Sequence, residues 1–250
     1  MRLTGKKVLI TGGARGIGLG CARMMAAQGA AVVIADIDEE AARREASAIE
    51  GCSAITLDVT KRADWQAAIS EADRLLGGLN VLVNNAGIII PGSIDSLDEE
   101  SWDRTMAVDL KSVFLGCQAA MPVLARSQPS SIINIASIAS IIASPYFAAY
   151  NAAKAGVHLL TKSVALNAAR KYPGVRCNSI HPAFVDTGMV DDVVRNASPQ
   201  EARSKLAGQI PLGRIATVED VGWAVVYLAS DESAFMTGAE IKLDGGISAM

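Results

Sequence analysis

Short apolar segments alternate along the chain with stretches of helical pattern, and this alternation is the feature that most restricts the possible folds. The segments are rich in Val, Ile and Leu, which is typical of strands buried on both faces. Strands that alternate with helices predict an α/β fold with a single doubly wound parallel sheet and helices on both faces. The predicted strands cover residues 6–11, 31–36, 53–58, 80–84, 131–136, 175–180 and 240–243, and the predicted helices between the first six strands cover 19–28, 38–49, 62–76, 99–125 and 150–171.

The domain organisation follows from the length of the chain and from what separates these elements. At 250 residues the chain fits one large α/β domain, and it contains neither a repeat nor a linker rich in Gly, Ser or Pro. We therefore predict one domain over residues 1–250. The polar segment 188–211 follows the sixth strand at the edge of the sheet where ligands bind, and its length predicts a mobile substrate lid.

The charge of the chain argues against partners that select basic surfaces. It has 23 basic and 26 acidic residues, a net charge of −3, and no block of like charge. Nucleic acid and anionic membranes are therefore not expected partners. No apolar run approaches the roughly 18 residues of a membrane span, and the N-terminus leads directly into the first strand, so we expect a cytoplasmic protein.

The cysteines and histidines form no metal-binding pattern. The four cysteines are far apart and make no CxxC pair, which is typical of small core residues in a reducing compartment. The two histidines, His158 and His181, have no ligand-type partners close by in the sequence. We interpret both as structural and expect no metal site.

A glycine-rich turn directly follows the first strand. Glycine allows the backbone to approach a pyrophosphate closely, and the helix that follows offers free N–H groups and a partial positive charge. Tight turns also use glycine, but the position between a strand and a helix favours a nucleotide site. The turn residues predicted to bind the cofactor are Gly12, Arg15, Gly16, Ile17 and Gly18.

Asp36, at the end of the second strand, indicates which dinucleotide is used. An acidic side chain about 20 residues after the glycine turn accepts hydrogen bonds from the adenosine-ribose hydroxyls, and it repels a 2′-phosphate. We therefore predict NAD, with the neighbouring Ile37 in the same site. Two alternatives remain open: Arg15 offers a cation to the 2′-phosphate of NADP, and Asp36 could instead cap a helix, although Asp38 is better placed to do so.

Polar or small residues also follow the third, fourth and sixth strands, at the ends where parallel sheets bind ligands. The end of the third strand offers a carboxylate and an N–H to an adenine edge. The end of the fourth strand offers amides where a cofactor crosses the sheet, and the proline turn after the sixth strand has a backbone and a hydroxyl that suit a carboxamide. Each pattern alone indicates only a turn, but their repetition at successive strand ends favours cofactor binding. The predicted residues are Asp58 and Val59; Asn85, Ala86 and Gly87; and Pro182, Val185 and Thr187.

A hydroxyl, a phenol and an ammonium are predicted to meet near the end of the fifth strand. Ser137 follows that strand directly, and Tyr150 and Lys154 are four residues apart on the next helix, so their side chains share one face. These groups are the ones needed to move a proton on or off an alcohol oxygen. A buried tyrosine with a satisfied hydroxyl is the alternative for Tyr150 alone, and the presence of the other two residues argues against it.

The order and spacing of these motifs resemble the short-chain dehydrogenase/reductase family. The resemblance covers essentially the whole chain, and within the family it is greatest to bacterial hydroxysteroid and secondary-alcohol dehydrogenases. It implies a Rossmann-like fold and a homotetramer whose interface uses the helices at 99–125 and 150–171. The segments that carry it are Thr11–Gly18, Asp58, Asn84–Gly87, Ser137, Tyr150-xxx-Lys154 and Pro182–Thr187.

The resemblance also implies catalytic roles. Tyr150 is then the general acid/base, Lys154 lowers its pKa and binds the nicotinamide ribose, and Ser137 holds the substrate oxygen. Lowering the pKa of a phenol from ~10 to near 7 requires about 4 kcal/mol of phenolate stabilisation, which an adjacent ammonium and an oxidised nicotinamide can supply in a dry pocket.

Two residues depart from the family pattern. Asp109 stands in the long helix where the family usually has an Asn that supports a water-linked proton path to the lysine, and we include it in the catalytic set. An ionised carboxylate cannot donate a hydrogen bond, so Asp109 is either protonated by burial or the relay is arranged differently. Ala183 stands where the family commonly has Gly, which costs little unless the backbone requires a positive φ.

The residues expected around the substrate are apolar, and no arginine among them is placed to bind an anion. They are Ile138, Ile141, Phe147, Met189 and Val190, and they surround the polar Ser137. We therefore predict an uncharged, hydrophobic secondary alcohol or its ketone, sterol-like or alicyclic. The alternatives are a 3-ketoacyl-thioester reductase of the same family, which would favour NADPH and a basic docking patch, and a protein that binds NAD without catalysis.

Overall fold

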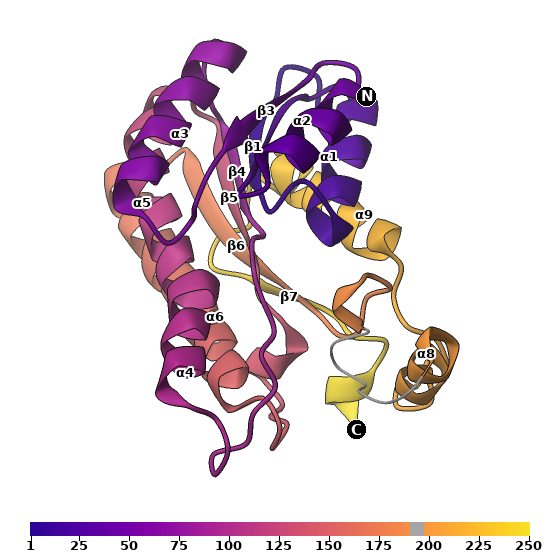
Figure 1. Ribbon diagram of the computed structural model, residues 1–250. Helices are drawn as coiled ribbons and strands as arrows, with labels where there is room; N and C mark the ends of the chain where they lie inside the picture. The colour runs from indigo at the N-terminus through magenta and orange to yellow at the C-terminus, as the bar shows by residue number, and fades with distance from the viewer. Residues whose placement is uncertain (191–197) are drawn as a thin grey trace.

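The computed structural model describes residues 1–190 and 198–250, and its centre is a parallel sheet of seven strands in the order β3-β2-β1-β4-β5-β6-β7. The order reverses between β1 and β4, so the chain winds outward from the middle of the sheet in both directions (Figure 1). This confirms the predicted doubly wound sheet. The strands are β1 Lys7–Thr11, β2 Ala31–Asp36, β3 Cys52–Thr56, β4 Val81–Asn84, β5 Ser130–Ile135, β6 Val175–Pro182 and β7 Glu240–Leu243.

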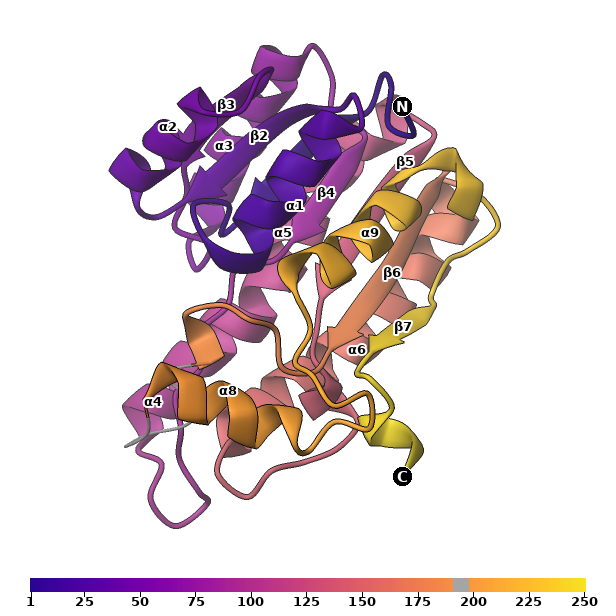
Figure 2. The same ribbon diagram turned by 90° about the vertical axis from the view of Figure 1, so that its right-hand side faces the viewer.

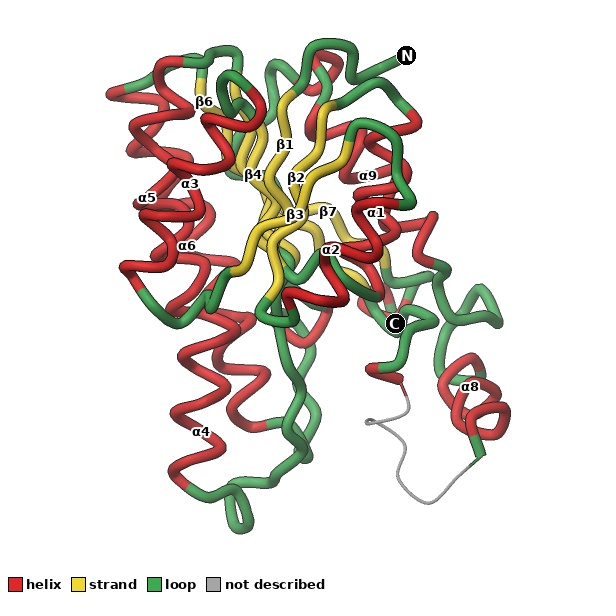
Figure 3. The backbone as a smooth tube through the Cα atoms, turned by 45° about the horizontal axis from the view of Figure 1, so that its top comes forward, coloured by secondary structure: helices red, strands yellow, loops and turns green. Residues whose placement is uncertain are grey.

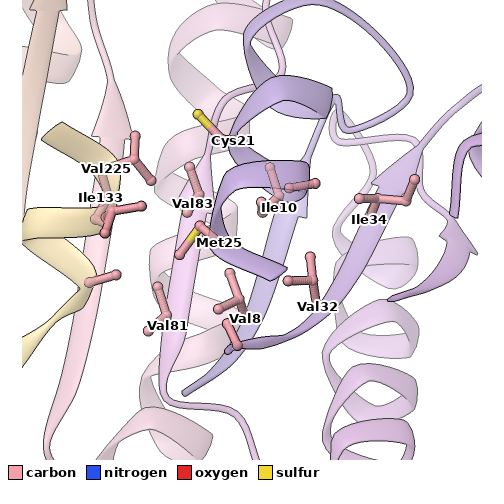
Figure 4. Close-up of a cluster of buried hydrophobic side chains, with 14 of the residues drawn as sticks. Val8, Ile10, Cys21, Met25, Val32, Ile34, Val81, Val83, Ile133 and Val225 are labelled. Carbon is pink, nitrogen blue, oxygen red and sulfur yellow. The ribbon is translucent and has the colours of Figure 1, made fainter. Parts of the chain in front are cut away.

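The central strands read as continuous apolar runs because both faces of the sheet are covered. In β1, Val8 and Ile10 belong to the core cluster under one helix layer (Figure 4), whereas Leu9 belongs to the cluster on the opposite face. In β2, Val32 and Val33 divide between the two clusters in the same way. Side chains along a strand point alternately to either face, so each face needs its own apolar set.

Two helix layers enclose the sheet, as Figures 2 and 3 show. Contact between α1 and α9 is close because glycines stand at the crossing. A Cβ added at Gly20 would lie 2.0 Å from Val218, and one at Gly222 would lie 2.2 Å from Met24. One layer consists of α1 Gly16–Ala27, α2 Glu39–Ser47 and α9 Val218–Ala229, and the other of α3 Arg62–Leu76, α5 Ser112–Arg126 and α6 Ala148–Lys171.

The helix predicted over residues 99–125 is present but interrupted by a π-helical turn. It consists of α4 Glu99–Met106, the turn Ala107–Lys111 and α5. By length and composition alone this run, Glu99–Arg126, would suffice to cross a membrane. Its most apolar 18 residues have a mean hydropathy of 1.3, and half of them are buried within the fold. π-Turns occur frequently at functional sites, and this one carries Asp109.

The predicted lid segment contains a helix that the polar pattern did not indicate. This helix, α8 Pro199–Ala207, begins at a capping box formed by Ser198 and Glu201, and its buried residues are Ala202 and Leu206. The lid also includes residues 191–197, which lie outside the described residues, and its mobility stays a prediction. In Figure 2, α4 and α8 lie on the side of the sheet toward which the β6 arrow points, beside the strand ends.

Candidate active site

The glycine turn between β1 and α1 is shaped to leave space above the start of the helix. A Cβ at Gly18 would lie 2.2 Å from the Gly12 carbonyl oxygen, and one at Gly12 would lie 2.9 Å from Ala86 Cα, so packing requires glycine at both positions. At Gly16, where φ is +54°, the nearest atom is a Thr187 methyl at 3.6 Å. The first turn of α1 has no side-chain cap and no acidic residue, which fits a pyrophosphate bound at its N–H groups.

Thr11 connects this turn to the segment after β4 and was absent from the predicted site. Its Oγ1 accepts hydrogen bonds from the backbone N–H groups of Asn85 (3.0 Å) and Ala86 (3.1 Å). The Asn85 amide donates to the carbonyl oxygens of Thr11 (2.9 Å) and Gly12 (3.1 Å), so this side chain anchors the turn. A hydroxyl at the last position of an apolar strand is the sequence signal that was overlooked.

Asp36 is held in place by backbone groups at the end of β2. One carboxylate oxygen accepts from Ala14 N (3.0 Å) and the other from Asp38 N (3.1 Å). The α2 N-cap is Asp38, which accepts from Ala41 N, so the alternative of Asp36 as the cap of that helix is wrong. Ile37 beside it is 68% exposed. Arg15 is exposed at the N-cap of α1.

At the predicted adenine site after β3, Asp58 makes hydrogen bonds and an ion pair within its own loop. The Asp58 carboxylate accepts from the N–H (3.0 Å) and hydroxyl (2.7 Å) of Thr60 and pairs with Lys61 at 3.1 Å. The Thr60 hydroxyl, with smaller contributions from the Thr60 N–H and Lys61, lowers the pKa of Asp58. The Val59 carbonyl accepts from the Trp65 indole at 2.9 Å.

The segment after β6 approaches the glycine turn although about 170 residues separate them in the chain. Pro182 is the last residue of β6, and Val185 is buried and pairs with Ala216 in an isolated bridge. Thr187 then lies next to Gly16. Ala183 donates to the Leu243 carbonyl oxygen (3.0 Å) and extends the ladder between β6 and β7, so the departure from glycine there is accommodated.

Ser137, Tyr150 and Lys154 gather at the end of β5, as the spacing predicted. Lys154 is buried, and its Nζ donates to the Ile135 carbonyl oxygen at 3.2 Å and lies 5.5 Å from the centre of the Tyr150 ring. Ser137 begins a short 3₁₀ turn, Ile138–Ser140, and its Oγ accepts from Ala139 N at 3.1 Å. Tyr150 itself is half-buried.

The environment of Tyr150 works against ionisation of its phenol in two ways and favours it in two others. Burial raises its pKa most strongly, and the negative charge of Asp109 raises it further, whereas the Lys154 ammonium and the Ser137 side chain lower it. The net effect is a pKa above the ordinary value. The positive charge of an oxidised nicotinamide would act in the same direction as Lys154.

Asp109 is fully buried and lies beside the same lysine. One carboxylate oxygen accepts from Ile88 N at 2.8 Å, and the other has no hydrogen-bond partner among the described residues. A Cβ at Gly87 would lie 3.4 Å from both Asp109 Oδ1 and Lys154 Nζ, so all three residues are neighbours. Burial, opposed by the Lys154 charge and the Ile88 N–H, raises the pKa of Asp109 to about 6.

The predicted substrate residues divide into exposed and buried ones. Ile138 and Val190 are buried, whereas Ile141 is 38% and Met189 39% exposed. Phe147 is half-buried next to the start of α6 and pairs with Gly92 in an isolated bridge.

A chain of buried side-chain hydrogen bonds lies behind the site and was also not predicted from the sequence. The Asn84 amide donates to Asn134 Oδ1 (2.8 Å), and the Asn134 amide donates to Thr161 Oγ1 (2.9 Å), which connects β4, β5 and α6. This chain fixes the helix that carries Tyr150 against the strand ends. A single Asn inside an Ile-rich strand was the signal, since a buried amide requires partners.

Comparison with known proteins agrees with this architecture. A family model described as Enoyl-(Acyl carrier protein) reductase matches residues 12–248. The chain is 44% identical over 246 residues to the 3-alpha-(or 20-beta)-hydroxysteroid dehydrogenase of Mycobacterium bovis, covering 98% of this chain and 90% of that protein. It is 42% identical over 258 residues to the trans-4-hydroxycyclohexanecarboxylate dehydrogenase of Sinomonas cyclohexanicum, covering 99% and 95%.

A solved structure supports the same conclusion. The ligand-free aldohexose dehydrogenase of Thermoplasma acidophilum superposes with a TM-score of 0.91 at 32% identity, covering 99% of this chain and 96% of that one. The match therefore extends over the sheet, both helix layers and the strand ends that carry the site. The chain belongs to the short-chain dehydrogenase/reductase family, whose members are oxidoreductases that use nicotinamide cofactors.

Proposed function

We propose that this protein interconverts an uncharged, hydrophobic secondary alcohol and its ketone with NAD(H), with Tyr150 as the general acid/base. The observation that carries the proposal is the convergence of Ser137, Tyr150 and Lys154 at one strand end, with Lys154 Nζ 5.5 Å from the Tyr150 ring centre. A protein that only binds a dinucleotide has no need for a phenol beside a buried ammonium.

The three residues divide the chemistry of the alcohol oxygen among them. Ser137 holds that oxygen, and the Tyr150 phenolate removes its proton during oxidation or returns one during ketone reduction. Lys154 stabilises the phenolate by its charge. A bound nicotinamide would supply the hydride acceptor or donor for the alcohol carbon. The turn residues Gly16–Gly18 would hold the pyrophosphate, and the segment from Pro182 to Thr187 would face the carboxamide.

Asp109 is proposed to occupy the position from which protons reach Lys154. Two observations support this: one carboxylate oxygen of Asp109 has no hydrogen-bond partner in the described part of the chain, and the carboxylate lies beside Lys154 Nζ. Below pH about 6 the carboxyl carries a proton and can donate a hydrogen bond, as the amide of an Asn would.

Asp109→Asn is expected to keep at least wild-type turnover and to shift the pH dependence of alcohol oxidation. The Asp109 charge raises the pKa of Tyr150, so its removal lowers that pKa, and the rising limb of the oxidation profile should move to lower pH. Rates measured across the pH range, with a melting curve to confirm folding, test this. A tenfold or greater fall in turnover with the fold intact would show that the carboxyl itself is required.

NAD is proposed over NADP because of Asp36. Its oriented carboxylate suits the two hydroxyls of an adenosine ribose and opposes a 2′-phosphate. The exposed Arg15 is the feature that favours NADP, so kinetics with both cofactors must be compared directly.

A cyclic, hydrophobic substrate is proposed from the apolar residues around Ser137 and from the relatives, which are named for a steroid and for a cyclic hydroxy acid. The absence of charge on the substrate is proposed from the apolar residues alone, because the hydroxy acid of the second relative carries a carboxylate. The deciding experiment is a panel of alicyclic and steroid alcohols, each uncharged or carrying a carboxylate, and acyl-thioester ketones, with NAD(H) and NADP(H) in parallel. We expect the highest kcat/KM for uncharged cyclic alcohols with NAD. Preference for the carboxylates would overturn the uncharged substrate, and preference for thioesters with NADPH would favour a 3-ketoacyl-thioester reductase.

The assembly is proposed to be a homotetramer in the cytoplasm. Apolar side chains on α5 and α6 are exposed in the single chain, at 41% for Phe114, 61% for Leu159 and 66% for Leu166, which supports burial of these helices in an interface. The four cysteines are all free, in keeping with a reducing compartment. Light scattering measures the mass of the assembly directly.

A further inference from the structure

A buried imidazole lies directly behind the turn that carries Ser137. His181, near the end of β6, is fully buried. Its Nδ1 is 2.7 Å from the Ser140 hydroxyl and 3.2 Å from the Ser137 carbonyl oxygen. On the opposite side of the ring, Nε2 is 2.8 Å from the Ser179 hydroxyl. Two serine hydroxyls thus bond to the two nitrogens of one ring, and only one of these serines belongs to the Ser137 turn.

The hydrogen bonds around the ring form one consistent set. The Ser140 hydroxyl donates to the Ser137 carbonyl oxygen at 2.6 Å, so it accepts from His181, and this places the imidazole proton on Nδ1. Nε2 then accepts from the Ser179 hydroxyl. Burial, together with the neighbouring His158, lowers the pKa of His181 to about 4, so the ring is neutral under ordinary conditions and keeps one donor and one acceptor.

The Ser137 carbonyl oxygen is therefore held by three donors. They are Ser140 N at 3.0 Å, the Ser140 hydroxyl at 2.6 Å and His181 Nδ1 at 3.2 Å, whose single N–H is shared between this carbonyl and the Ser140 hydroxyl at 2.7 Å. The Ser137 hydroxyl, on the other side of the same residue, accepts from Ala139 N within the same turn. The Ala139 N–H that holds the Ser137 hydroxyl belongs to the same turn as this carbonyl, so contacts that fix the turn also fix the hydrogen-bond partner of the hydroxyl.

We propose that His181 is a positioning residue for Ser137. Through Nδ1 and the Ser140 hydroxyl it fixes the turn, and thereby holds the Ser137 hydroxyl where the substrate oxygen binds. This rests on the function proposed above, in which Ser137 contacts that oxygen. His181 itself contacts neither substrate nor cofactor in this scheme. Because His181 belongs to β6, its hydrogen bonds connect Ser137, which lies just beyond the end of β5, to the sheet.

The two serines provide a matched pair of variants. Ser140→Ala removes the hydroxyl that links the ring to the turn, whereas Ser179→Ala removes only the partner on the far side of the same ring. Because a small misplacement of a reacting group can cost up to about 100-fold in rate, we expect Ser140→Ala to lower kcat at least tenfold. Ser179→Ala should keep kcat within twofold of wild type. Neither change should alter the dissociation constant of NADH.

His181→Asn provides the conservative rescue. The amide nitrogen of Asn is bonded to Cγ, as Nδ1 of His is, so it can still donate to the turn. The amide nitrogen of His181→Gln is one bond further from the backbone, as Nε2 of His is, so it can reach only toward Ser179. We expect kcat of the Asn variant to exceed that of the Gln variant at least threefold, although both lose stability by leaving space in the core. Melting temperatures of the two variants show whether they are folded equally well.

Hydrogen exchange tests the proposal without any turnover. Peptides that cover residues 137–142 should exchange faster in Ser140→Ala than in wild type, and at the wild-type rate in Ser179→Ala. Equal kcat values in the two serine variants, or equal exchange at residues 137–142, would overturn the positioning role. If wild type oxidises no alcohol in the panel, the proposed function fails by itself. Exchange at residues 137–142 that is faster in His181→Gln than in His181→Asn then still decides whether His181 holds the turn, because both variants keep the Ser140 hydroxyl's own bond to the Ser137 carbonyl.

Discussion

Tyr150→Phe is expected to lower kcat by roughly 10³-fold or more while NADH binding stays near the wild-type value. The change removes only the hydroxyl that exchanges the proton, and general acid/base groups typically contribute 10²- to 10⁴-fold. The ring remains in place with the Lys154 ammonium 5.5 Å from its centre, so the cofactor side of the cleft keeps its shape. Steady-state rates with the best alcohol of the panel and fluorescence titration with NADH measure the two quantities separately.

Tyr172→Phe is the matched control for this experiment. Tyr172 is the C-cap of α6, the helix that also carries Tyr150, and lies at its opposite end. Removal of its hydroxyl should leave kcat unchanged. Undiminished catalysis in Tyr150→Phe would refute the proposed mechanism, and loss of NADH binding in that variant would mean that the hydroxyl serves the cofactor site.

Asp36→Ala should change the cofactor preference more than any other single substitution in the dinucleotide site. Loss of charged hydrogen bonds to a ribose, each contributing about 1.5–3 kcal/mol, predicts a fall in kcat/KM for NAD of about 100-fold. The value for NADP should rise, because the charge that repels a 2′-phosphate is gone and the exposed Arg15 remains. The ratio of the two kcat/KM values, measured with one alcohol, is the readout.

Asp38→Ala separates cofactor recognition from local folding. Asp38 is two residues away and caps α2 through Ala41 N, so its loss should cost about 1 kcal/mol of stability. It should leave the ratio of NAD to NADP efficiency unchanged. Because Asp36 also holds Ala14 N and Asp38 N, some loss of stability is expected in Asp36→Ala too. An unaltered cofactor ratio in Asp36→Ala would contradict the assignment of NAD.

Local pattern was sufficient for much of this structure. The predicted strand 31–36 and helix 62–76 coincide with β2 and α3, because each carries its own apolar period and its own end signals. The meeting of Tyr150 with Lys154 was also predictable, since the four-residue spacing on one helix determines it. The helix α8 was missed although the Ser198–Glu201 capping box marks its start in the sequence, because only Ala202 and Leu206 are buried and they make a weak helical period.

By itself, then, the sequence determined the alternation of strands and helices, the glycine turn and the set of residues at the strand ends. Only the tertiary structure decided which other distant residues meet: Thr11 with Asn85, the Asn84 amide with Asn134, and His181 with the turn of Ser137. These contacts join segments that are brought together by the crossovers of the sheet, and no local propensity encodes them. Burial adds the final difference, because it turns Asp109 from an ordinary carboxylate into one with a pKa of about 6.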